Sequence, residues 1–200
     1  MRLLSAILVI LITTFCSCSS SYSVVNSETY DDAGLESHKT FHIVDLKMGA
    51  LPPHMDRLTY ENIVSAIRGE MLERGYKESP GSPLLVNFAV TIHDETVLSP
   101  SGHEYDNGPY YSGTYPCYIY PKDHYWDDYF LDAGVIDDIY EEGVLTIDII
   151  NIKKKETLYT SSVASIMDSY GNYRDVTEIG KAVTKLFSDY PVRPLSQYSR

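Results

Sequence analysis

The segment Val144-Leu145-Thr146-Ile147-Asp148-Ile149-Ile150 is rich in β-branched residues, as expected of a β-strand. Lys153-Lys154-Lys155 follows, a run too charged to bury and suited to a solvated turn, and a second strand is expected from Leu158 to Met167. Side chains alternate along a strand, so one face carries Leu145, Ile147 and Ile149 and the more polar face carries Val144, Thr146 and Asp148. The segment predicts a β-hairpin whose apolar face another layer must cover.

A first amphipathic helix is predicted before the hairpin, from Tyr60 to Arg74. Its apolar residues recur mostly at spacings of three and four: Ile63, Val64, Ile67, Met71 and Leu72. Thr59 is a plausible N-cap, and Gly75 suits the C-terminal stop.

A second amphipathic helix is predicted after the hairpin, from Val176 to about Tyr190. Asp175, with Glu178 three residues later, resembles a capping box, and Pro191 ends the helix. These two helices are the expected covers of the hairpin's apolar face.

Two further strands are expected at Thr40 to Leu46 and at Leu84 to Ile92. The order of elements predicts a two-layer α/β (α+β) fold, in which a mixed or antiparallel sheet carries two helices on one face. The expected division is a signal peptide (1–17), a lipidated N-terminus with tether and lead-in (18–39), one α/β domain (40–191) with an insertion (99–133), and a C-terminal tail (192–200).

The first residues have the pattern of a secretory signal peptide. Arg2 precedes an almost wholly apolar run from Leu3 to Ile12, which is too short to span a bilayer. Ser17-Cys18 resembles the end of a bacterial lipoprotein signal, in which the cysteine is acylated and becomes the first mature residue. Cys16 fits this pattern less well because Phe15 precedes it, and an ordinary cleaved signal peptide is the alternative.

Acylation of Cys18 would supply the two or more acyl chains that stable membrane attachment requires. Ser19 at the next position is typical of lipoproteins sent to the outer membrane, and Ser19 to about Ser27 is expected to be a flexible tether. Cys117 is then the one cysteine left in the mature chain. It is expected to be either buried, which is the simpler interpretation, or a free thiol able to cross-link two molecules.

The charge balance argues against nucleic acid as a partner. The chain has 16 basic and 28 acidic residues and a net charge of -12, which repels phosphate backbones and anionic lipid headgroups. Membrane attachment would therefore come from the lipid and not from a basic patch. Tyrosine is unusually frequent, with 18 residues against one Trp and five Phe.

The order of the elements resembles the DUF4136 family of bacterial lipoproteins, a domain of unknown function. The matching pieces are Lys39-Thr40-Phe41, Ile67 and Met71 before Leu72-Glu73-Arg74-Gly75-Tyr76, Pro83 to Phe88, Tyr140 to Asp148, and Tyr190-Pro191. One departure is Leu158-Tyr159, where typical members carry an apolar-aromatic pair such as Val-Trp. The resemblance implies a lipid-anchored, periplasm-facing α/β domain with no established activity, no cofactor and no catalytic residues.

The insertion at 99–133 is the stretch best suited to a specific chemistry, because a loop this long in a small domain is usually functional or mobile. Its glycines and prolines are expected to break any helix or strand. Its tyrosines are expected either to pave the open face of the sheet or to form a recognition surface for a protein or a glycan. The candidate residues of that surface are Tyr110, Tyr111, Tyr125 and Trp126.

A metal site formed by His103, His124 and nearby carboxylates is a weaker hypothesis, because no fixed ligand spacing holds the two histidines together. An enzyme acting on envelope glycans is another alternative. The usual nucleophile, phosphate-binding, dinucleotide-binding and zinc motifs are missing from the sequence. We therefore expect a non-enzymatic binding or accessory lipoprotein of the cell envelope, with the membrane and an envelope protein or glycan as partners.

Overall fold

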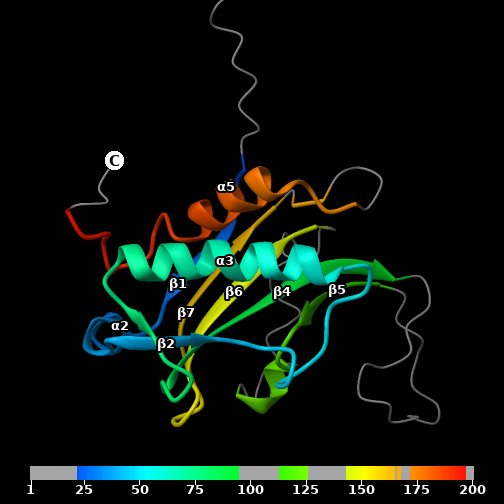
Figure 1. Ribbon diagram of the computed structural model, residues 1–200. Helices are drawn as coiled ribbons and strands as arrows, with labels where there is room; N and C mark the ends of the chain where they lie inside the picture. The colour runs from blue at the N-terminus through cyan, green and yellow to red at the C-terminus, as the bar shows by residue number, and fades with distance from the viewer. Residues whose placement is uncertain (1–21, 95–112, 126–142, 165, 168–171, 197–200) are drawn as a thin grey trace, which may run out of the picture.

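Seven β-strands form one open, mixed sheet in the computed structural model, which describes residues 22–94, 113–125, 143–164, 166–167 and 172–196 (Figure 1). The main path of the sheet runs β1 (Val24–Thr29), β7 (Glu156–Val163), β6 (Leu145–Asn151), β4 (Leu84–Asp94), β2 (Thr40–Ile43) and β3 (Lys77–Glu78). β2 pairs in parallel with β4 and β3, whereas the other pairs are antiparallel. β5 (Gly113–Tyr118) pairs with the second half of β4.

The predicted hairpin lies at the centre of the sheet. β6 and β7 pair from Leu145 opposite Val163 to Asn151 opposite Glu156, with an irregularity between Ile149 and Ile150. The lysine run forms the turn, and Lys155 takes a positive φ of 57° there. The hairpin interpretation is confirmed.

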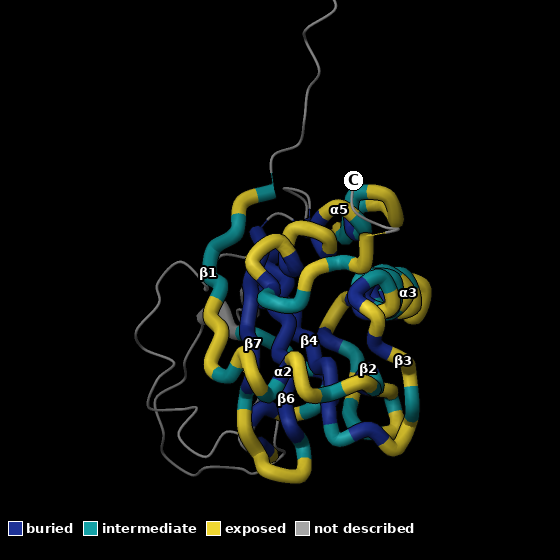
Figure 2. The backbone as a smooth tube through the Cα atoms, turned by 90° about the vertical axis from the view of Figure 1, so that its left-hand side faces the viewer, coloured by how far each residue is buried: buried dark blue, intermediate teal, exposed yellow. Residues whose placement is uncertain are grey.

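Within the described part of the chain, three helices pack on the sheet, so the predicted α+β class is confirmed with one helix more than expected. α3 (Arg57–Glu73) and α5 (Val176–Leu186) are the two predicted covers, and α2 (Asp32–Ser37) is the additional short helix. Figure 2 shows the central strands as buried, whereas α3 and α5 keep exposed residues on their outer faces.

The helix ends follow from local hydrogen bonds. α3 begins three residues before the predicted start because the carboxylate of Asp56, and not Thr59, is the N-cap; it accepts a bond of 2.7 Å from the Thr59 amide. At the other end, Gly75 has a φ of +87°, and the Tyr76 amide donates to the Met71 carbonyl. These two features form a Schellman-type end, and Gly75 ends the helix as predicted. Asp175 caps α5 as predicted.

The alternation of side chains divides the sheet into a helix face and a far face. The helix face carries Leu145, Ile147 and Ile149, all fully buried, and Phe88 stacks on Tyr60 of α3 with ring centroids 5.8 Å apart. The far face carries polar residues on neighbouring strands. Asn87 lies opposite Asp148, which lies opposite Thr160.

The prediction of a flexible tether to about Ser27 is wrong from Val24 onward, and the predicted lead-in to Lys39 contains a helix. β1 pairs with β7 over Val24–Thr29, and α2 follows with Leu35 fully buried. β1 was missed because its residues are mostly polar and form no apolar alternation, although they pair with β7 from Val24 opposite Val163 to Thr29 opposite Tyr159. The folded part therefore begins well before residue 40.

The prediction that the insertion lacks regular structure is wrong for 113–118, which form β5. Pro116 lies within this strand, opposite Thr91 of β4. β5 pairs with β4 alone among the described strands, and an edge strand tolerates proline because one of its sides needs no amide donor.

Candidate functional site

A buried polar cluster on the far face of the sheet holds the described part of the insertion. We call it the far-face cluster; its members are Asn87, Lys122, Tyr125, Asp148 and Thr160. Asp148 is fully buried and Lys122 is 9% exposed. Their carboxylate and ammonium groups are 3.1 Å apart. Because an isolated charge is costly to bury, this pair is expected to depend on its surrounding hydrogen bonds.

Those hydrogen bonds come from three different elements. The Asp148 carboxylate accepts a bond of 2.5 Å from the Thr160 hydroxyl on β7 and one of 2.8 Å from the Tyr125 hydroxyl. The Tyr125 hydroxyl in turn accepts a bond of 3.0 Å from the Asn87 side chain on β4. The carboxylate is thus satisfied from both sides, as a buried charge requires.

Lys122 is held by an aromatic neighbour as well as by Asp148. Its ammonium group donates a bond of 2.9 Å to the Tyr118 hydroxyl and lies 4.8 Å from the centre of the Tyr118 ring. The short helix η1 (Lys122–His124) places Lys122 and Tyr125 on the same side of the chain, where both reach Asp148.

Backbone contacts attach the same segment to the sheet and to the loop after β2. Asn87 bonds both the amide and the carbonyl of Tyr120, at 3.1 and 2.8 Å. Ala50 donates to the Ile119 carbonyl at 3.2 Å. The neighbouring Gly49 lies so close that a Cβ there would overlap this carbonyl. Residues 113–125 are therefore fixed to the domain over their whole length.

The structure divides the predicted recognition residues into two groups. Tyr125 is only 2% exposed and belongs to the far-face cluster, so its assignment to an exposed recognition surface is wrong. The ring was assigned to the surface because sequence alone did not reveal that Asp148 needs its hydroxyl. Tyr110, Tyr111 and Trp126 lie outside the described residues.

The metal hypothesis receives no support from the described part of the chain. No group of three or more His, Cys, Asp or Glu side chains could hold an ion there. His124 is exposed and packs its ring edge against Tyr120, with centroids 5.0 Å apart, and His103 lies outside the described residues. Cys117 is half-buried and packs against the core.

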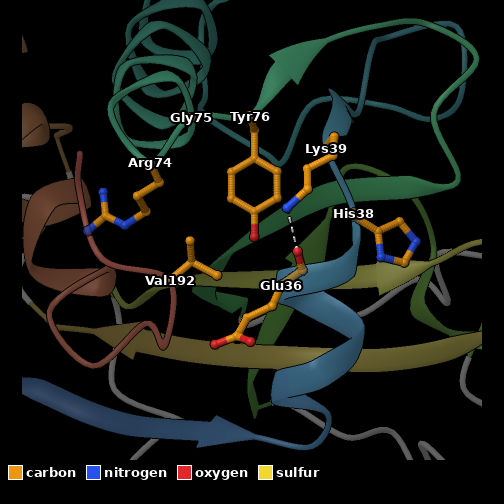
Figure 3. A pocket seen from close by; sticks show the side chains of 7 residues that line it. All are labelled: Glu36, His38, Lys39, Arg74, Gly75, Tyr76 and Val192. Atoms are coloured by element: carbon orange, nitrogen blue, oxygen red, sulfur yellow. Dashed lines mark hydrogen bonds between the residues drawn. The ribbon is translucent and has the colours of Figure 1, made fainter.

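A shallow pocket lies on the other side of the molecule, between α2 and the C-terminal end of α3 (Figure 3). Its cavity volume is about 50 Å³, and its lining residues are Glu36, His38, Lys39, Arg74, Gly75, Tyr76 and Val192. Drug-sized ligand sites usually exceed about 300 Å³.

Most polar groups around this pocket bond to the protein itself. Lys39 donates to the carbonyl of Glu36 at 2.9 Å, and the Tyr76 hydroxyl donates to the Leu35 carbonyl at 3.0 Å. The Arg74 guanidinium points away from Tyr76 in Figure 3 and pairs with Glu70 at 2.6 Å. The side chains around the pocket therefore serve mainly to hold α2, α3 and the end of the chain together.

No described helix is long and apolar enough to cross a bilayer.

The far-face cluster leaves neither Asp148 nor Lys122 accessible to a ligand, since both side chains are enclosed by their partners. The geometry supports a structural role for the cluster, which is to position the insertion on the sheet.

Comparison with known proteins identifies the family. The model of the domain of unknown function DUF4136 matches residues 25–192, and the chain belongs to this family. No curated protein matches the chain.

Among solved structures, the chain is similar to a PDZ domain protein from Parabacteroides distasonis, with 16% sequence identity and a TM-score of 0.43. The likeness covers 88% of this chain and 37% of that one. A TM-score of 0.43 is too low to assign a fold or a function from this likeness.

Proposed function

We propose that this DUF4136 protein is a lipoprotein of the bacterial cell envelope, acylated at Cys18, whose domain acts as a binding or accessory module. The sequence signal for acylation lies at 1–18, outside both the described fold and the residues that the family model matches. The first described element, β1, begins at Val24, and α2, α3, α5 and the other strands are built from later residues. This separation between the signal and the fold is what we expect of a leader followed by an anchored domain.

The proposed location is the outer membrane, with the domain facing the periplasm, because Ser19 follows the acylated residue. No cofactor and no nucleic acid enter the proposal. An ordinary cleaved signal peptide would give a diffusible protein with the same domain.

The recognition surface is proposed to lie on the insertion side of the sheet. The observation that supports it is the attachment of 113–125 by β5 and by the buried Lys122–Asp148 pair. The attached segment belongs to the insertion, and the aromatic residues of the insertion are of the kind well suited to contact a protein or a glycan.

Intact mass and membrane fractionation of the native protein beside a Cys18→Ser variant test the anchor. We expect the native chain to begin at residue 18, to carry added acyl mass and to fractionate with membranes, whereas the variant is released. Cys16→Ser is the matched control and should keep both the mass and the membrane location. A native chain without acyl mass would contradict the proposal and favour the diffusible protein.

Photo-crosslinking tests the recognition surface. A photoreactive phenylalanine analogue at Tyr111 should give a discrete protein adduct, or retention on purified cell-wall glycan, and the same analogue at Tyr30, which is 49% exposed on the domain, should give neither. Equal adducts at both positions, or none at either, would contradict the recognition surface without affecting the anchor.

A further inference from the structure

The point at which the chain enters the fold is fixed beside α5. The Tyr22 hydroxyl donates a bond of 2.6 Å to the carboxylate of Glu178, and the Ala164 amide donates to the Ser23 carbonyl at 3.2 Å. Burial and the Glu178 carboxylate raise the pKa of Tyr22 to about 12, so the hydroxyl remains a donor at neutral pH. Both views show β1 beginning at the α5 side of the molecule (Figures 1 and 2).

The covalent distance from Cys18 to this point is short. Four residue steps separate Cys18 from Tyr22, and a fully extended chain spans at most about 14 Å over four residues. A folded chain of roughly 175 residues has a radius of gyration of about 16 Å. If Cys18 is acylated, as proposed above, the tether is therefore shorter than the domain's own radius.

A tether of that length cannot let every side of the domain approach the lipid. Seven residue steps of β7 separate Val163, near the entry point, from Glu156, next to the hairpin turn. That distance is about 23 Å at the rise of a strand. The end of the domain that carries Tyr22 must stay within about 14 Å of the membrane surface. The domain therefore cannot stand upright on the β6–β7 turn, because that would place the entry point about 23 Å above the lipid.

The surface of α5 near the entry point suits lipid headgroups better than the chain as a whole. Val176 in its first turn is 58% exposed, and Thr177 is also exposed. The segment 174–189 carries three basic residues (Arg174, Lys181, Lys185) and three acidic ones (Asp175, Glu178, Asp189), so it is neutral in a chain of net charge -12. Anionic headgroups therefore repel this neutral segment less than they repel an average stretch of the acidic chain.

We infer that the entry face, formed by Tyr22, Val176, Thr177 and Lys181, rests on the lipid headgroups of the membrane that holds the acylated Cys18. The inference depends on the proposed acylation and adds an orientation to it. The segment around η1 lies on the opposite side of the molecule from α5 in Figure 1, so the far-face cluster and the described part of the insertion are directed away from the lipid. A partner of the insertion would then approach from the periplasmic space.

Tryptophan quenching by brominated lipids tests this orientation. The full-length acylated protein is reconstituted in vesicles of phosphatidylethanolamine and phosphatidylglycerol brominated near the top of the acyl chains. Trp126→Phe removes the single native Trp. Thr177→Trp then reports on the entry face, and Lys154→Trp on the exposed hairpin turn. We expect the bromolipid to quench the Thr177→Trp protein several-fold more than the Lys154→Trp protein.

Lengthening the tether provides the matched control. Ten Gly-Ser residues inserted between Ser20 and Ser21 should bring the two quenching values closer together, because the domain can then turn. Equal quenching of the two tryptophans in protein with confirmed acyl mass would overturn the orientation and leave the lipoprotein proposal intact. Protein without acyl mass would overturn both.

Discussion

The Tyr125 hydroxyl donates a hydrogen bond of 2.8 Å to the Asp148 carboxylate, and this contact joins the described part of the tyrosine-rich insertion to the central strand of the sheet. Asp148 lies in β6, inside the hairpin that organises the fold, whereas Tyr125 follows η1. Asp148, a buried residue of the central strand, therefore also positions the insertion, on which the recognition surface is proposed to lie.

Replacing Asp148 should destabilise the domain strongly. Asp148→Asn leaves the Lys122 ammonium buried without the carboxylate that lies 3.1 Å away, and breaking a buried pair in this way is expected to cost about 3 kcal/mol of unfolding free energy. Urea unfolding measures this cost. Glu156→Gln is the control, because its pair with Lys154 is exposed and should contribute less than about 1 kcal/mol. Equal losses in the two variants would contradict the structural role of the far-face cluster.

Tyr125→Phe removes one hydroxyl and keeps the ring. The hydroxyl bonds both Asp148 and Asn87, so we expect a loss of about 1–2 kcal/mol, smaller than for Asp148→Asn. Tyr30→Phe is the matched control, because the Tyr30 hydroxyl bonds Glu28 on the surface and its loss should be nearly neutral. Limited proteolysis should also cut the insertion of Tyr125→Phe faster than that of the native protein, and an unchanged rate would show that Tyr125 does not hold it.

Replacement by alanine should change the stability of the domain in opposite directions at two glycines, one inside α3 and one at its C-terminal end. Gly75→Ala should destabilise by about 1–2 kcal/mol, because φ at this position is +87° and an L-residue is strained there. Gly69→Ala, inside α3 with open space around the added Cβ, should stabilise by about 0.5–1 kcal/mol. Thermal unfolding of the two variants checks both signs, and a stabilising Gly75→Ala would contradict the Schellman-type end.

Stability should fall in mild acid through His42. Burial lowers the pKa of this imidazole in the fold, so below its ordinary value of 6.5 the unfolded chain binds more protons than the native one. The contribution of His42 to the unfolding free energy is therefore fully present above pH 6.5. It declines as the pH falls from 6.5 through the lowered pKa of the folded state. Urea midpoints at pH 7.5 and 5.5 measure the decline. His42→Gln should reduce it, and an identical decline in the variant would exclude His42 as its source.

The main elements could be predicted because their signals are local. The alternation from Leu145 to Ile149 identified a strand and its buried face, and the spacing of Ile63, Ile67 and Met71 identified α3. Asp175 and Gly75 marked helix ends because capping depends on the residue and its immediate neighbours. The family resemblance rested on the same segments, and the match over 25–192 confirms it.

The missed elements depend on partners distant in sequence. β1 is polar and becomes a strand because β7 offers a ladder of backbone partners. β5 forms despite Pro116 because β4 extends beyond the end of β2 and leaves an edge to fill.

The sequence by itself determined the hairpin, the two principal helices, the α+β class and the family. These features depend on the spacing of apolar residues and on helix capping, which are properties of residues close together in the sequence. Only the tertiary structure decided that Tyr125 is buried, that Lys122 pairs with Asp148, and that the chain enters the fold beside α5. The physical reason is that a buried charge requires partners, and residues 23 or more positions apart meet as partners only after the sheet has brought them together.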